Sequence, residues 1–155
     1  MEQGIADTSR IGIAGVSYGG YMAGWAVTQT DRFAASVAIS VVADFRSFHL
    51  TSEVAAWAES VLRADWNDVG GPYDERSPVT HAHKATTPTL VIAGELDRCT
   101  PPAQGELLFG ALAAAGCETE LVVLPGEGHV PVSRPYALEA IRRTQAWFDC
   151  YLGHR

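Results

Sequence analysis

The sequence predicts an α/β protein in which a parallel sheet is covered by helices on both faces. Its short aliphatic runs are continuous rather than alternating, which is typical of strands buried on both faces of a parallel sheet. Helical patterns separate these runs, and strands that alternate with helices imply right-handed βαβ crossovers. With 155 residues, 47% of them hydrophobic and 19% charged, the chain is expected to fold as one domain over residues 1–155.

The elements are expected in strict alternation along the chain. Four aliphatic runs are the expected strands: residues 10–15, 36–42, 89–94 and 120–125. The first expected helix, 18–30, leaves the first strand directly, and the second, 52–63, gathers its large apolar side chains on one side. A glycine at 116 suits the end of a helix over 102–115, and a proline at 135 suits the first turn of a helix over 135–152. Residues 67–87 are expected to form irregular cover.

Composition and charge exclude several classes of function. The net charge is −7, from 11 Lys and Arg against 18 Asp and Glu, so no basic surface for nucleic acid is expected. Residues 11–30 carry no charge but include five glycines, which is unlike a membrane span. Residues 1–10 are polar and do not resemble a signal peptide. The cysteines Cys99, Cys117 and Cys150 form no C-x-x-C pair, so free thiols and a cytoplasmic location are expected.

A nucleophile motif follows the first expected strand. Residues 15–19 read Gly-Val-Ser-Tyr-Gly, a G-x-S-x-G sequence between a strand and a helix. We expect glycine at both flanks because strand and helix cross closely, which holds Ser17 in a strained turn with its hydroxyl exposed. The backbone N–H of Tyr18, at the start of the helix, is expected to point toward a developing oxyanion.

A base and an acid follow the next strand ends along the chain. Asp97 comes three residues after the third strand, and His129 follows the fourth within residues 126–129. Carboxyl ends of parallel strands meet at one rim of the sheet, so both side chains are expected beside Ser17. The order Ser, Asp, His is that of the α/β-hydrolase fold. Asp97 would orient His129, and His129 would take and return the proton.

Other polar residues also lie close to the ends of the expected strands. Asp44 follows the second strand and is an alternative acid, while Glu95 and Glu127 are interpreted as loop carboxylates that bind nearby amides. Cys99 is expected near the site but has no partner base.

No metal or other cofactor is expected. The His81-x-His83 pair has no Cys or carboxylate cluster around it and is interpreted as surface histidines. The glycine-rich turn lacks both a phosphate-loop lysine and a G-x-G-x-x-G pattern.

Several motifs in order resemble one known family. They are residues 15–21 (GVSYGGY), 73–78 (YDERSP), 87–91 (TPTLV), 94–98 (GELDR), 100–104 (TPPAQ) and 125–129 (PGEGH). Together, across residues 9–152, they resemble the catalytic domain of the prolyl oligopeptidase family of serine peptidases, in its acylaminoacyl-peptidase and dipeptidyl-peptidase-like branch. The resemblance implies an α/β-hydrolase fold and hydrolysis of peptide bonds through an acyl-enzyme.

The resemblance also implies roles for individual residues. Ser17 matches the nucleophile, Asp97 the acid and His129 the base. Tyr18 matches a residue that gives its amide to the oxyanion hole and its ring to the substrate pocket. Val42, Phe45 and Phe48 fall where the family lines that pocket with apolar groups, although ordinary core packing explains the two phenylalanines equally well.

One departure from the family pattern is large. The family carries further strands, an oxyanion loop and a β-propeller ahead of the elbow, so we expect this chain to be the C-terminal portion of a longer catalytic domain, without a propeller. The open edge of the first strand would then favour self-association or pairing with a partner segment. Two alternatives to a peptidase acting on peptide substrates stay open: a carboxylesterase of the same fold, and a non-catalytic remnant that needs its upstream segment.

Overall fold

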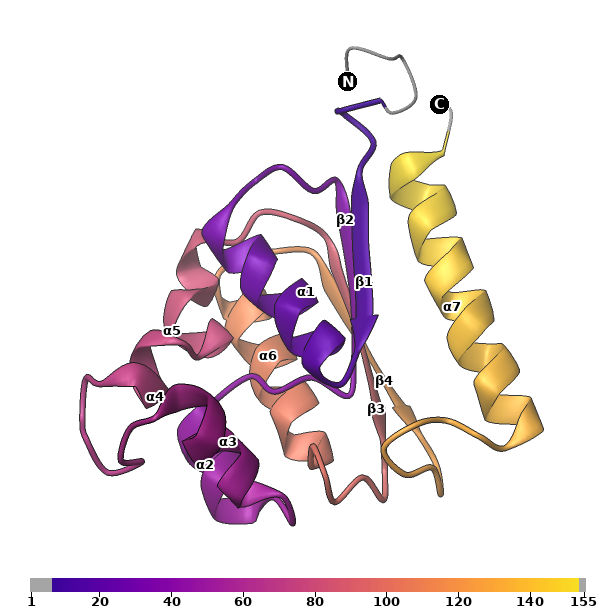
Figure 1. Ribbon diagram of the computed structural model, residues 1–155. Helices are drawn as coiled ribbons and strands as arrows, with labels where there is room; N and C mark the ends of the chain where they lie inside the picture. Colours follow the sequence, from indigo (N-terminus) through magenta and orange to yellow (C-terminus); the bar gives the residue numbers. More distant parts are fainter. Residues whose placement is uncertain (1–6, 154–155) are drawn as a thin grey trace.

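Among residues 7–153, which the computed structural model describes, the strands form one parallel sheet (Figure 1). Its order is β1 (Gly12–Val16), β2 (Ala35–Ile39), β3 (Thr89–Gly94) and β4 (Thr119–Leu124). Each strand pairs in parallel with the next, from Gly12 opposite Ala35 to Gly94 opposite Leu124. The sheet confirms the predicted fold class. The prediction that residues 1–10 are not a signal peptide falls partly on residues 1–6, which lie outside the described residues.

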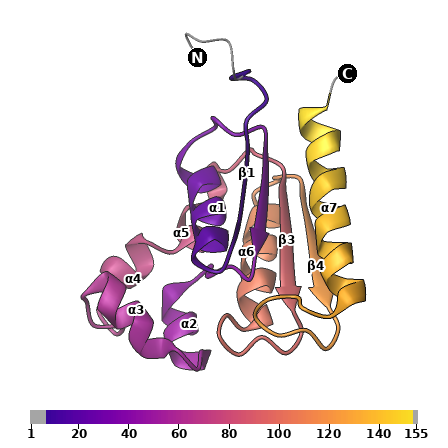
Figure 2. The same cartoon turned by 45° about the vertical axis from the view of Figure 1, so that its right-hand side comes forward.

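Helices cover both faces of this sheet, as predicted. On one face lie α1 (Tyr18–Gln29), which packs on β1 and β2, and α6 (Pro102–Ala114), which packs on β3 and β4. On the other face α7 (Arg134–Leu152) packs on β2 and β3, and Figures 1 and 2 show it alone on that side of the strands. Right-handed crossovers that all advance in one direction put their helices on the same face, which explains why α1 and α6 lie together.

The connection from β2 to β3 holds more helix than predicted. It contains α2 (Phe45–Thr51), α3 (Ala55–Leu62), two single-turn helices α4 (Pro72–Glu75) and α5 (Pro78–His81), and the 3₁₀ turn η1 (Ala82–Lys84). The predicted helix over 52–63 is therefore α3 with a later start, and the segment 67–87 is not irregular throughout. Prolines occupy the first turns of α4 and α5, where a missing N–H costs nothing.

Helix α2 was missed because the apolar run before it continues past the end of its strand. The prediction extended that strand to residue 42, but β2 ends at Ile39, and Ser40 turns the chain out of the sheet with φ 49°. Asp44 then caps α2, its carboxylate accepting hydrogen bonds from the backbone N–H groups of Arg46 and Ser47.

Burial differs between the inner and outer strands. Only the inner strands fit the prediction of burial on both faces: β3 is buried throughout, and β2 at every residue but Ile39, which is partly exposed. Strands β1 and β4 keep exposed or partly exposed residues because, within the described residues, each has a neighbour on one side only. The expectation that all four strands are fully buried is therefore wrong for these two.

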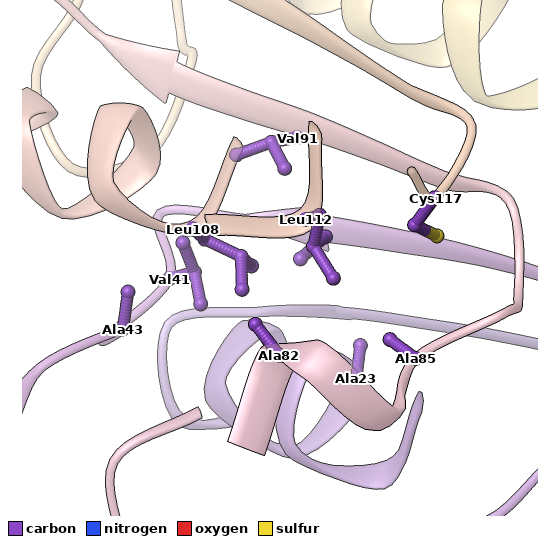
Figure 3. Close-up of a cluster of buried hydrophobic side chains, with 10 residues drawn as sticks. Ala23, Val41, Ala43, Ala82, Ala85, Val91, Leu108, Leu112 and Cys117 are labelled. Carbon is purple, nitrogen blue, oxygen red and sulfur yellow. The ribbon is translucent and has the colours of Figure 1, made fainter. Parts of the chain in front are cut away.

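Buried apolar side chains gather in layers around the sheet. Between the sheet and the α1–α6 layer lies the cluster drawn in Figure 3, which includes Ala23, Val41, Val91, Leu108 and Leu112. Beneath α7 lies a second cluster, made of Val37, Leu90, Ile92, Leu124 and Ala140. A third, largely aromatic cluster joins α1 to the β2–β3 connection through Tyr21, Val42, Phe45, Phe48, Ala58 and Tyr73. This third cluster fixes the segment that borders the site.

Candidate active site

The turn between β1 and α1 holds Ser17 in a strained conformation. Its backbone has φ 60° and ψ −119°, a region that side-chain-bearing residues rarely occupy. The strain is fixed on both sides. The Ser17 N–H donates to the carbonyl of Ile39 at 2.9 Å, and the Ser17 carbonyl accepts from the N–H of Tyr21 at 2.9 Å. The serine hydroxyl is thereby held at the carboxyl end of the sheet.

Two glycines make this tight turn sterically feasible: Gly15, as predicted from the motif, and Gly20 instead of the predicted Gly19. A Cβ on Gly15 would lie 2.3 Å from the carbonyl carbon of Gly19, and one on Gly20 would lie 2.2 Å from the carbonyl oxygen of Ile39. At Gly19 itself a Cβ would meet no atom within 4 Å. The close crossing of strand and helix therefore constrains Gly15 and Gly20. The prediction that no side chain fits at position 19 is wrong.

A hydrogen-bonded chain connects Ser17 to the two predicted partners. His129 Nε2 lies 2.8 Å from Ser17 Oγ, and His129 Nδ1 lies 2.9 Å from Asp97 Oδ2. The Asp97 side chain is completely buried, whereas 27% of the His129 side chain is exposed. The structure thus brings together three side chains that are 80 and 32 residues apart along the chain.

The turn after β3 holds the Asp97 carboxylate through its own backbone. Asp97 Oδ1 accepts hydrogen bonds from the N–H of Cys99 at 2.9 Å and of Thr100 at 2.8 Å. Asp97 Oδ2 accepts the Thr100 hydroxyl at 2.7 Å in addition to its contact with His129. Four donors therefore surround this carboxylate within the described residues, which fixes the plane in which it meets the imidazole.

The loop after β4 presents His129 and is held at several points. Its residue Glu127 accepts the N–H of Leu96 at its carbonyl, at 2.8 Å, so the loops after β3 and β4 are joined. The hydroxyl of Ser40 donates to the carbonyl of His129 at 2.7 Å. The buried Glu127 carboxylate accepts the Val132 N–H at 2.8 Å and the Ser133 hydroxyl, and these hydrogen bonds lower the pKa of Glu127 below its ordinary value. The sequence predicts this amide-binding role for Glu127 but not its link to the residues directly before α7.

An apolar cavity of about 280 Å³ opens beside Ser17. Its lining residues are Ser17, Tyr18, Val42, Phe48, Val54, Trp57, Cys99 and Thr100. Val42, Phe48 and Tyr18 therefore border this cavity. Phe45 does not, because it packs behind the wall against Tyr21, with ring centroids 5.1 Å apart.

Sequence reasoning did not assign Val54, Trp57 or Thr100 to the site. Trp57 lies in the expected helix over 52–63, and its ring is 5.8 Å from that of Tyr18 and 5.9 Å from that of Phe48. Cys99 borders the cavity as expected, and burial together with the nearby Asp97 raises the pKa of its thiol. A thiol held in its protonated form is a poor competitor for the nucleophilic role.

The backbone amide of Tyr18 is the first of α1 and directly follows Ser17. No acceptor among residues 7–153 receives a hydrogen bond from it, as expected for the first turn of a helix. The N-terminal end of α1 also carries the positive end of the helix dipole. An N–H in this position suits an anionic oxygen bound next to Ser17.

The other polar residues near the strand ends have local structural partners. Asp44 caps α2 instead of facing His129, and Glu95 accepts the Gly126 N–H at 2.8 Å. His81 Nε2 lies 2.8 Å from the Glu75 carbonyl, and His83 is exposed. In the described part of the chain, no group of three His, Cys, Asp or Glu side chains is arranged to hold a metal ion. None of the helices within residues 7–153 is long and apolar enough to cross a membrane.

Fold and site together define a class. The α/β-hydrolase fold has a parallel sheet with helices on both faces. It also has a serine in a strained strand-to-helix turn, close to residues that follow later strands of the sheet. Both features are present here.

Comparison with known proteins narrows this class to a family. The profile of the prolyl oligopeptidase family matches residues 1–155. An uncharacterised peptidase of Bacillus subtilis, YuxL, is 35% identical over 150 residues, which cover 94% of this chain and 23% of that protein. Among solved structures, a puromycin-hydrolysing peptidase of Mycobacterium tuberculosis matches with a TM-score of 0.91 at 29% identity, over 99% of this chain and 24% of its own. An acylaminoacyl peptidase of Pyrococcus horikoshii matches with a TM-score of 0.88 at 27% identity, over 96% of this chain and 25% of its own.

The chain belongs to the prolyl oligopeptidase family. It spans about a quarter of the length of the relatives that it matches.

Proposed function

We propose that this chain carries the catalytic centre of a serine peptidase that hydrolyses short peptides through an acyl-enzyme. Ser17 is the nucleophile, His129 the general base and Asp97 the acid that orients His129. The observation that supports this most is the continuous chain of contacts at 2.8 Å between Ser17 and His129 and at 2.9 Å between His129 and Asp97. Membership in a family of peptidases supports the same reading.

The proposed first half-reaction forms the acyl-enzyme. His129 Nε2 takes the hydroxyl proton as Ser17 Oγ bonds to the carbonyl carbon of the scissile peptide, and the carbonyl electrons move onto its oxygen. The backbone N–H of Tyr18 is our proposed donor to this oxyanion. When the tetrahedral intermediate collapses, the C–N bond breaks and His129 gives its proton to the leaving amine. Water then attacks the ester in the same way, which releases the acid and restores Ser17.

The cavity beside Ser17 is the proposed substrate pocket. Its wall of Tyr18, Val42, Phe48 and Trp57 is apolar and aromatic, which favours an apolar side chain next to the scissile bond. Phe45 acts in this proposal as support behind the wall, since it packs on Phe48 and Trp57.

Hydrolysis of matched chromogenic substrates tests the proposal. We expect saturable release of p-nitroaniline from an acylated dipeptide p-nitroanilide, and loss of that activity in Ser17→Ala. Turnover of p-nitrophenyl esters without amide turnover would favour the carboxylesterase instead. If the folded chain turned over neither substrate, the non-catalytic alternative would stand.

Three further proposals concern the molecule as a whole. We propose that residues 1–155 form one unit of a catalytic domain, which the family match over that range supports. A reducing, cytoplasmic compartment is supported by the three cysteines, all within the described part and all free. Pairing of a second chain or a partner segment with β1 is supported by its position at an edge of the sheet within residues 7–153, and sedimentation at several concentrations would test self-association.

A further inference from the structure

Thr100 makes a contact that the proposed mechanism does not use. It is buried, and its hydroxyl donates to Asp97 Oδ2 at 2.7 Å while lying 3.2 Å from His129 Nδ1. The same Asp97 oxygen lies 2.9 Å from His129 Nδ1. Thr100 Oγ1, Asp97 Oδ2 and His129 Nδ1 therefore form a closed triangle of polar atoms.

The donors within this triangle can be assigned from chemistry. A threonine hydroxyl has one proton to donate and two lone pairs that can accept, whereas an ionised carboxylate has no proton to donate. The short Thr100–Asp97 contact therefore uses the hydroxyl proton, so the longer contact with His129 leaves Thr100 Oγ1 as an acceptor. Asp97 Oδ2 consequently shares its negative charge between a neutral hydroxyl and the imidazole. Each hydrogen bond that the carboxylate accepts from another donor weakens its electrostatic attraction to a proton held by His129.

We propose that Thr100 is a positioning residue: its hydroxyl fixes Asp97 Oδ2 against His129 Nδ1 and takes up part of the negative charge that the imidazole would otherwise face. The consequence for catalysis rests on the proposed function, in which neutral His129 is the base. The effect on the imidazole itself is independent of any turnover.

The other ionisable groups around this pair are engaged elsewhere. Glu127, in the loop that carries His129, points its carboxylate at Val132 and Ser133. Cys99 contacts Asp97 through its backbone N–H, and Glu53 lies 3.8 Å from the Arg98 guanidinium on the outer side of the turn. The Thr100 hydroxyl is thus the neutral side chain that acts on the Asp97–His129 contact directly.

Titration of the His129 side chain by ¹H–¹⁵N NMR tests this proposal without requiring activity. Thr100→Val keeps the branched shape and removes the hydroxyl, while Thr100→Ser keeps the hydroxyl and serves as the matched control. We expect the midpoint of the His129 titration to rise by about half a pH unit or more in Thr100→Val, and Thr100→Ser to match the parent chain within about 0.2. Should Thr100→Val fail to fold, Thr100→Ala removes the same donor, and the same upward shift is expected.

An unchanged or lowered midpoint in a folded Thr100→Val chain would overturn the proposal. An upward shift in a chain that hydrolyses no amide would support the role of Thr100 while refuting the proposed peptidase function. In an active chain, the acid limb of kcat/KM against pH should move with the NMR midpoint. A merely structural role for Thr100 would lower the plateau and leave that limb in place.

Discussion

At the scale of single residues, the positive φ of Ser17 persists because the surrounding backbone leaves no room to relax. Gly15 and Gly20 allow the closest approaches in this turn, to Gly19 and to Ile39 respectively. The hydrogen bond from Ser17 N–H to Ile39 ties the same turn to the end of β2. The geometry of the proposed nucleophile thus depends on residues that carry no chemistry of their own.

Alanine substitution at two adjacent glycines separates this constraint from helix propensity. In Gly20→Ala the new Cβ would lie 2.2 Å from a backbone oxygen, so the elbow must shift, and we expect a loss of about 1–3 kcal/mol in the free energy of unfolding. The control Gly19→Ala meets no atom within 4 Å and should be neutral or stabilising by up to about 1 kcal/mol. Urea denaturation measures both, and equal effects at the two positions would contradict the steric account.

At the scale of elements, α2 supplies Phe48 to the pocket wall and depends on its cap. Asp44 accepts two backbone N–H groups of the first turn, at 3.3 and 3.1 Å, and the helix is only seven residues long. Asp44→Ala should therefore cost about 1–2 kcal/mol in the free energy of unfolding. Asp31→Ala, at an exposed loop position, is the control and should change it by less than about 0.5 kcal/mol. A cost at Asp44 no larger than at Asp31 would show that α2 forms without its cap.

The loop between β4 and α7 is expected to weaken on acidification. The folded-state pKa of Glu127 is lowered below 4.5 by hydrogen bonds from Ser133 and Val132, so its stabilising contribution is fully present above that value. It is lost as pH falls through the lower, folded-state pKa. We expect Glu127→Gln to be less stable than the parent chain at pH 7, with the difference shrinking as pH falls from 4.5 toward 3.

Urea midpoints at both pH values measure this difference. Glu106→Gln, an exposed position on α6, is the matched control and should show no such pH dependence. A difference for Glu127→Gln that stays constant between pH 7 and pH 3 would contradict the charge-based explanation.

At the scale of the whole molecule, the site lies at the carboxyl end of the sheet, whereas α7 packs along one face of it, on β2 and β3. Phe148 of α7 packs on the cluster of Val37, Leu90 and Ile92, whereas Ile141 on the same helix is 62% exposed. Phe148→Ala should cost about 2 kcal/mol in unfolding free energy, and Ile141→Ala less than about 0.5 kcal/mol. Thermal unfolding checks both. A fall in the catalytic rate of folded Phe148→Ala would show that α7 supports the site more directly than its contacts indicate.

Sequence reasoning reached the parts of this molecule that local patterns encode. The elbow at Ser17 was predictable because strand, turn and helix are contiguous, and the rim positions of Asp97 and His129 followed from the parallel order of strands. Trp57 and Thr100 were not assigned to the site, because their roles depend on how the segment after β2 folds back over α1 and on one turn's hydrogen bonds. The end of β2 was predicted three residues too late for a local reason, since nothing in the run 36–42 marks the positive φ of Ser40.

The reactivity of Ser17 toward a fluorophosphonate tests the central claim most directly. We predict stoichiometric labelling of Ser17, identified by mass spectrometry, and no labelling of Ser17→Ala. In His129→Gln the rate of labelling should fall by a factor of about a hundred or more. Circular dichroism should confirm that all three chains are folded. Absence of labelling in the folded parent chain, or an unchanged rate in His129→Gln, would contradict the account.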